Sequence, residues 1–161
     1  MSPSLSIMTD RIAALLRDQA QADGFSPSRL SGVLYARSEV DMPRYPALYD
    51  PSIIILGSGS KRAYVGDVVH RLDPGHYWLV AVPMAFACET LTATDGPLVG
   101  LSIRVDSAVL GELLLETDEG ADNAGPVPPG LCAAPMTDAL AGAALRLTEA
   151  LGSEQDARVL G

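Results

Sequence analysis

Apolar side chains near the N-terminus recur close to the spacing of an α-helix. In the stretch "SIMTDRIAALLRDQAQADG" they occupy Ile7, Ile12, Leu15 and Leu16. Gly24 closes the stretch, and glycine is common just beyond the C-terminus of a helix. The pattern predicts a helix over residues 6–22. Because its apolar stripe is narrow, we expect this helix to pack on the outside of the domain.

Residues 32–106 show a different sequence pattern, in which short runs of β-branched or aromatic residues are separated by Gly, Pro and Asp. Two tight turns are indicated, at Gly66-Asp67 and at Asp73-Pro74-Gly75. Such closely spaced runs are typical of a β-sandwich or β-barrel. Strands are predicted over residues 33–39, 52–56, 61–65, 68–72, 76–82, 87–93 and 98–105.

Alternation within the strands predicts which side chains share a face. Four such sets are Val99, Leu101, Ile103 and Val105; Gly100, Ser102 and Arg104; Val68, His70 and Leu72; and His76, Trp78, Val80 and Val82. Both histidines are therefore expected among apolar neighbours on their own strands.

The C-terminal third is predicted to contain a short helix, a loop and a second long helix. The short helix covers residues 107–116, and the acidic, proline-rich loop covers residues 116–136, with a short strand at 130–134. The last helix covers residues 137–151, is capped by Thr137 or Asp138, and ends at Gly152. We expect residues 1–161 to form a single domain, with the β-rich part over residues 32–106.

The stretch "LGSGSKRAYVGD" at residues 56–67 has the order of parts of a phosphate-binding loop, in which a strand runs into glycines and a lysine. A Walker-type loop needs four residues between its first glycine and the Gly-Lys pair, and must then open a helix. Neither condition is met, because a β-hairpin pattern follows Lys61. We therefore interpret the stretch as a strand connection, with Lys61 facing solvent.

Charge excludes one class of function. The formal net charge is −9, and residues 83–161 carry three Lys/Arg against twelve Asp/Glu. A chain this acidic lacks the basic face that neutralises phosphates, so these residues are not expected to bind nucleic acid themselves.

Cysteine usage and hydropathy point to an ordinary globular protein of the cytoplasm. Cys88 and Cys132 are the only cysteines, and no C-x-x-C motif is present, so neither a disulfide framework nor a zinc knuckle is indicated. The N-terminus lacks the pattern of a secretory signal, and no apolar run approaches a membrane span. We expect no membrane partner.

A long stretch, "YDPSIIILGSGSKRAYVGDVVHRLDPGHYWLVAVPMAF", resembles the N-terminal domain of one branch of the AraC/XylS family of bacterial transcription regulators. The resemblance extends over about residues 30–161 and includes Pro97 of "PLVGLSIRVD" and the terminal "ALRLTEALGSEQDARVLG". It departs from the family pattern at Ser58, where a glutamine is expected, and in the shortened segment Val82–Phe86.

The resemblance implies a mainly β fold with flanking helices: a cupin-like β-barrel, or double-stranded β-helix, with an N-terminal helix and C-terminal helices. It also implies an effector-sensing or dimerising role. DNA binding would reside in a C-terminal pair of helix-turn-helix motifs that these residues do not contain.

The alternative is a stand-alone cupin enzyme with a mononuclear metal in the barrel. A metal-binding cupin typically supplies two closely spaced histidines, a carboxylate and a third histidine. This chain has two histidines, His70 and His76, and Glu89 is the carboxylate that spacing leaves available. No motif for a catalytic serine or cysteine is present. We expect no catalysis, no metal and no cofactor.

A small-molecule effector is expected at the mouth of the barrel, where an apolar concavity needs a few polar groups. Each candidate also has a simpler interpretation: the aromatic residues as core, the arginines as surface side chains, and His70 as a half-buried strand residue. Together they suit a small aromatic or carboxylated effector. The candidates are Tyr35, Arg37, His70, Trp78, Phe86 and Arg104.

The last predicted helix carries an apolar stripe that must be buried. Leu140, Leu147 and Leu151 lie along it with Ala144. One hypothesis places these leucines at the seam of a homodimer, because a two-fold contact is the commonest solution for such a surface. The alternative is that the stripe packs on its own domain.

Overall fold

A computed structural model of the chain describes residues 1–106, 108–109 and 130–153. The predicted short helix over residues 107–116 and most of the predicted acidic loop over residues 116–136 lie outside the described residues, as do residues 154–161.

The first helix, α1 (Pro3–Gln19), begins earlier than the sequence pattern predicts. Its start is set by Ser2, whose hydroxyl accepts a hydrogen bond from the Leu5 amide at 3.1 Å, and by a proline in the first turn. The predicted apolar stripe was wrong at Ile7, which is 70% exposed. Gly24 begins the first strand instead of closing the helix. The buried face consists of Leu5, Thr9, Ile12, Ala13 and Leu16.

Ten strands follow within the described residues and form two antiparallel sheets. Sheet A has six strands in the order β1-β2-β9-β4-β7-β10, and sheet B has four in the order β3-β8-β5-β6. The strands are β1 (Gly24–Pro27), β2 (Val33–Ser38), β3 (Met42–Tyr49), β4 (Ser52–Ser58), β5 (Ser60–Val65), β6 (Val68–Leu72), β7 (His76–Val80), β8 (Met84–Leu91), β9 (Leu98–Arg104) and β10 (Leu131–Pro135).

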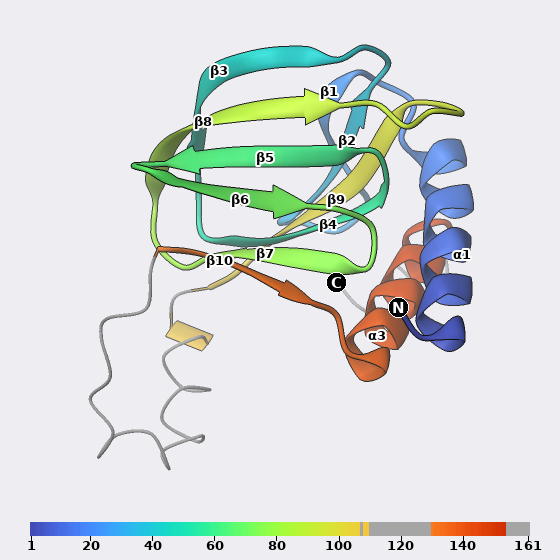
Figure 1. Cartoon of the computed structure of the whole chain (residues 1–161). Helices are drawn as coiled ribbons and strands as arrows, with labels where there is room; N and C mark the ends of the chain where they lie inside the picture. Colours follow the sequence, from blue (N-terminus) through green and yellow to red (C-terminus); the bar gives the residue numbers. More distant parts are fainter. Residues whose placement is uncertain (107, 110–129, 154–161) are drawn as a thin grey trace.

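The predicted fold class, mainly β with flanking helices, is confirmed. The described strands do not close into a single barrel, since no ladder joins sheet A to sheet B. They form a cupin-like β-sandwich, and the two helices pack on one side of it (Figure 1).

Sheet A is the middle of three layers, and each of its faces lies against a separate apolar core. Its inner face packs on sheet B through residues that include Ile54, Trp78 and Phe86. Its outer face packs on the helices through residues that include Ile55 and Leu101. Adjacent isoleucines on β4 therefore enter different cores, as side chains that alternate across a strand require.

The second long helix, α3 (Asp138–Leu151), lies beside α1 and runs in the same direction. At one end the Ser2 hydroxyl donates a hydrogen bond to the Asp138 carboxylate at 3.1 Å. At the other end the Gln19 amide donates to the Thr148 carbonyl at 3.0 Å. The predicted caps are confirmed: Thr137 begins α3 and Gly152 ends it. Neither described helix has the length and apolarity that crossing a membrane requires.

The stretch at residues 56–67 contains a strand connection, as the sequence pattern predicts. Gly59 alone joins β4 to β5, and the Gly66-Asp67 turn after β5 pairs Val65 with Val68. Gly59 has φ +80°, and a Cβ there would lie 2.7 Å from the Leu91 carbonyl oxygen. This position therefore requires glycine for the geometry of its backbone.

Close approach of α1 to β4 depends on Gly57. A Cβ at this position would lie 2.7 Å from the Ala13 Cα, which belongs to backbone and cannot easily move. We expect Gly57→Ala to destabilise the fold by about 1–3 kcal/mol through overpacking, measured as the free energy of urea-induced unfolding.

Gly96→Ala is the matched control, because a Cβ there meets nothing within 4 Å and neither glycine has a positive φ. Equal unfolding free energies for the two variants would show that the helix does not rest on the strand at this point.

Candidate functional site

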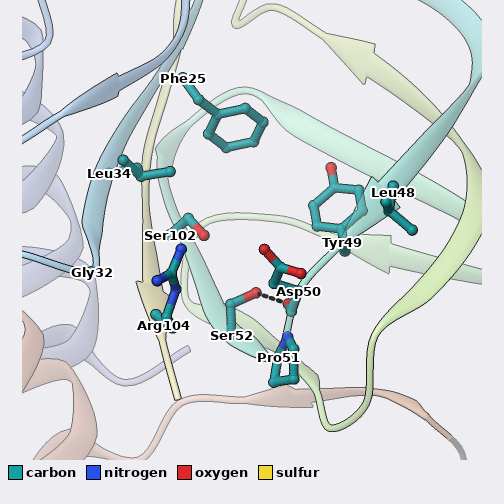
Figure 2. Close-up of a pocket in the computed structure, with 10 residues that line it drawn as sticks. All are labelled: Phe25, Gly32, Leu34, Leu48, Tyr49, Asp50, Pro51, Ser52, Ser102 and Arg104. Atoms are coloured by element: carbon teal, nitrogen blue, oxygen red, sulfur yellow. Dashed lines mark hydrogen bonds between the residues drawn. The ribbon is translucent and has the colours of Figure 1, made fainter. Parts of the chain in front are cut away.

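A cavity of about 190 Å³ lies at one end of the space between the two sheets. Figure 2 shows its walls, which come from β1, β2, the β3–β4 connection and β9. It is smaller than the roughly 300–1,000 Å³ of pockets for drug-sized ligands. The lining residues are Phe25, Gly32, Leu34, Leu48, Tyr49, Asp50, Pro51, Ser52, Ser102 and Arg104.

Strand register explains why these residues meet. Leu34 pairs with Ser102, and Ser52 pairs with Arg104, so all four lie on the inner face of sheet A. Tyr49 is the last residue of β3 in sheet B. The cavity therefore forms where sheet B stops covering the inner face of sheet A.

The β3–β4 connection is held in place by two hydrogen bonds. The Ser52 hydroxyl donates to the Asp50 carbonyl at 2.9 Å, and the Val105 amide donates to the Pro51 carbonyl at 3.0 Å. These bonds fix the turn that carries the Asp50 side chain, so the carboxylate starts from a defined backbone position at the cavity rim.

The cavity contains one cation and one anion that are not neutralised by the surrounding protein. The Arg104 guanidinium and the Asp50 carboxylate are both exposed. Within the described part of the chain, neither side chain makes a hydrogen bond or an ion pair. A ligand that enters the cavity therefore meets both charges with their bonding capacity free.

Tyr49 separates the cavity from the aromatic core. Its ring stacks on Phe86 with centroids 4.7 Å apart, and Phe86 meets Trp78 edge to face at 6.3 Å. Burial raises the pKa of the Tyr49 phenol, and the adjacent Cys88 thiol raises it further. The ring is thus a neutral wall, backed by two aromatic side chains.

The six predicted ligand residues do not converge on one site. Arg104 lines the cavity, and Phe86 and Trp78 lie behind its Tyr49 wall. His70 is half-buried on β6 in sheet B.

The other two predicted residues, Tyr35 and Arg37, serve the helix side of sheet A. The Tyr35 hydroxyl donates to the Gln19 side chain at 2.9 Å. The Arg37 guanidinium donates to the Ala20 carbonyl at 3.0 Å and forms an ion pair with Glu39. Arg37 therefore satisfies a free carbonyl at the end of α1.

Several lining residues were not predicted from the sequence, although part of the signal was present. Alternation had already placed Ser102 on the same face as Arg104. The motif Tyr49-Asp50-Pro51-Ser52 begins the stretch that resembles the regulator family, and all of it lines the cavity. The contribution of Phe25 and Leu48 had no signal, because their strands were not predicted.

Lys61 does not face solvent, so that expectation was wrong. It is the only lysine in the sequence and is 4% exposed. The reason is register: Lys61 pairs with Leu72 and with Thr90, which occupy the inner face of sheet B. A side chain at this position must enter the space between the sheets.

The Lys61 ammonium lies in a small polar cluster within the core. It donates to the Thr90 hydroxyl at 3.0 Å and lies 3.9 Å from the Cys88 sulfur, which also accepts from Tyr49 at 3.8 Å. No carboxylate pairs with it in the described part of the chain. Burial lowers the pKa of Lys61, and the nearby Cys88 thiol offsets part of that shift.

The geometry does not support a metal site built on His70, His76 and Glu89, because His70 and Glu89 do not converge. His70 pairs with Ala63, whereas Glu89 pairs with Arg62, so the two side chains lie on opposite faces of sheet B. Glu89 also forms an ion pair with Arg62 at 3.0 Å. Among the described residues, no cluster of three or more His, Cys, Asp or Glu side chains could hold a metal ion.

These features define a class of structure: a cupin-like sandwich with helices packed on the outer face of sheet A. Its small polar cavity, called the chamber from here on, lies where sheet B ends. Sequence comparison then gives the family. The chain belongs to the family described as the AraC-type transcriptional regulator N-terminus, which matches residues 29–161. A comparison with curated protein sequences finds no match.

Solved structures of similar fold include ToxT from Vibrio cholerae. One ToxT structure has a TM-score of 0.50 at 10% identity, over 71% of this chain and 47% of that one. A second, of apo ToxT K231A from Vibrio cholerae strain SCE256, has a TM-score of 0.48 at 10% identity, over 82% of this chain and 52% of that one. The chain thus spans about half the length of these structures, and the first likeness shows a shared fold.

Burial of Lys61 predicts that the stability of the fold depends on pH. Because the pKa of Lys61 is lower in the fold than its ordinary value of 10.5, the unfolded chain binds the proton more readily. Stability should then rise with pH between the lowered pKa and the ordinary one. We expect wild type to gain stability relative to Lys61→Met as the pH rises toward 10.5, measured by urea unfolding at each pH.

Arg146→Met controls for the loss of a positive charge, because Arg146 is exposed on α3. Its stability should stay parallel to wild type over the same range. If the Lys61→Met profile also ran parallel, the buried amine would not be titrating between folded and unfolded states.

Proposed function

We propose that this chain is the effector-sensing domain of an AraC-type transcriptional regulator that acts in the cytoplasm. The observation that carries the proposal is the family match over residues 29–161, on a sandwich with a polar chamber at one end. DNA contacts would be made by a separate helix-turn-helix domain. The net charge of −9 supports this division, because it disfavours phosphate contacts by the sensing part.

A short path connects the chamber to the helices. Ser102 and Arg104 line the chamber from the inner face of β9. On the outer face of the same strand, Leu101 and Ile103 belong to the core that holds α1 and α3. A ligand that shifts β9 would therefore act on the helix layer through a single sheet.

Dimerisation through α3 is the second part of the proposal. Leu151 is buried in the core of its own domain, whereas Leu140 and Leu147 are only partly buried against it. Ala143 lies beside these two leucines on the helix surface, on the side away from Leu151, and is exposed. We propose that Leu140, Leu147 and Ala143 line a seam on this exposed side of α3, with Leu151 anchoring the helix beneath it.

Sedimentation velocity on the isolated chain tests the seam. We expect wild type to be a dimer at micromolar concentration, and Ala143→Glu to be a folded monomer, because a carboxylate would be buried at the centre of the contact. Leu147→Glu should have the same effect, and circular dichroism would check that each variant is folded.

Glu149→Gln is the control and should remain dimeric, because Glu149 is exposed on α3 and lies about 120° around the helix from Ala143. A wild-type monomer, or a dimer that persists in Ala143→Glu, would show that α3 does not form a dimer interface.

A thermal-shift screen against small metabolites tests effector sensing. A true effector at 100 times its Kd should stabilise the chain by about 2.7 kcal/mol. The compound should be recovered unchanged after prolonged incubation, since a sensor binds without turnover. Conversion of the compound would instead favour an enzyme, and the absence of any stabilising metabolite would contradict effector sensing.

A further inference from the structure

The free charges in the cavity differ from the other close charges of the described chain. Ion pairs join Arg17 to Asp95, Arg37 to Glu39, Arg62 to Glu89 and Arg71 to Asp73. Arg104 and Asp50 line one cavity, yet no ion pair joins them in the part of the chain that the structure describes. Their arrangement leaves a gap between opposite charges.

The backbone brings the two charges to the same end of the sheet. Arg104 lies directly across from Ser52 in the sheet, and Asp50 lies two residues before Ser52, in the connection between β3 and β4. Figure 2 shows Arg104 and Asp50 on either side of Ser52, with the Ser102 hydroxyl on the Arg104 side. A ligand that carries both an anionic and a cationic group would therefore meet a partner for each charge.

The remaining walls of the cavity are apolar. Leu34 lies on the inner face of sheet A, and Phe25, which is 49% exposed, stands at the rim. Apolar side chains beside two free charges favour a ligand that has an apolar part as well as a polar head.

From this arrangement we propose that the cavity binds a small zwitterion of the α-amino acid type with an apolar side chain. The carboxylate accepts hydrogen bonds from the Arg104 guanidinium, which is shaped for bidentate contact, and from the Ser102 hydroxyl. The ammonium donates to the Asp50 carboxylate. The side chain of the ligand covers Phe25 and Leu34. A volume of about 190 Å³ suits a single amino acid. The inference rests on the proposed sensing function and specifies its ligand.

Isothermal titration calorimetry with L-leucine and L-phenylalanine tests the proposal directly. Three analogues of leucine separate the contacts: N-acetyl-leucine lacks the ammonium, leucinamide lacks the carboxylate, and 4-methylpentanoate lacks the amino group. We expect binding of at least one free amino acid and at least tenfold weaker binding of each of its analogues, since hydrogen bonds to charged groups contribute about 1.5–3 kcal/mol.

Two variants assign the contacts to residues. Arg104→Gln should weaken binding of the free amino acid at least tenfold and abolish its preference over leucinamide. Asp50→Asn should abolish its preference over N-acetyl-leucine. Both side chains are exposed, so neither change should affect folding. Asp67→Asn, on the exposed β5–β6 turn, is the control and should bind like wild type.

The outcomes separate this inference from the proposed function. If the analogues bind as well as the free amino acid, or if both variants bind like wild type, the zwitterion site is wrong. If no amino acid binds while another metabolite stabilises the chain, the ligand class is wrong and effector sensing stands. If no compound of either kind binds, both fail.

Discussion

The constraint on which the rest of the structure depends is the burial of sheet A on both faces. One face must match sheet B and the other must match two parallel helices, so β4 has isoleucines on both sides and no polar alternation. This double burial fixes the position of the sheet from either side. The inner face becomes accessible where β3 ends, and the chamber forms there because sheet B no longer covers it.

The interior of the sandwich is not uniformly apolar. A chain of polar contacts runs from Tyr49 through the Cys88 sulfur to Lys61 and Thr90. A buried ammonium without a carboxylate partner opposes folding, because it loses hydration that a single hydroxyl does not replace. Tyr49 belongs both to this chain of contacts and to the chamber wall. A ligand that moves the Tyr49 ring would therefore also disturb the surroundings of Lys61.

The pattern of residue types along the chain was sufficient to predict the strands that are rich in β-branched residues. One example is β6, whose bounds agree with its predicted range. It failed at β3, because Pro43 and Pro46 interrupt the strand and most of its side chains are exposed. Proline is tolerated there because β3 is an edge strand. Lys61 and the cavity were beyond local pattern for a different reason: both depend on which strands pair, and register between distant segments cannot be derived from one segment alone.

The first strand has an evolutionary consequence. β1 lies before the residues that match the family, yet its Phe25 forms part of the chamber rim. Substitutions confined to this N-terminal segment could reshape the rim while leaving the family domain and its two cores intact. A change at Phe25 would therefore alter the rim without opening a hole in either core, because Phe25 belongs to neither of them.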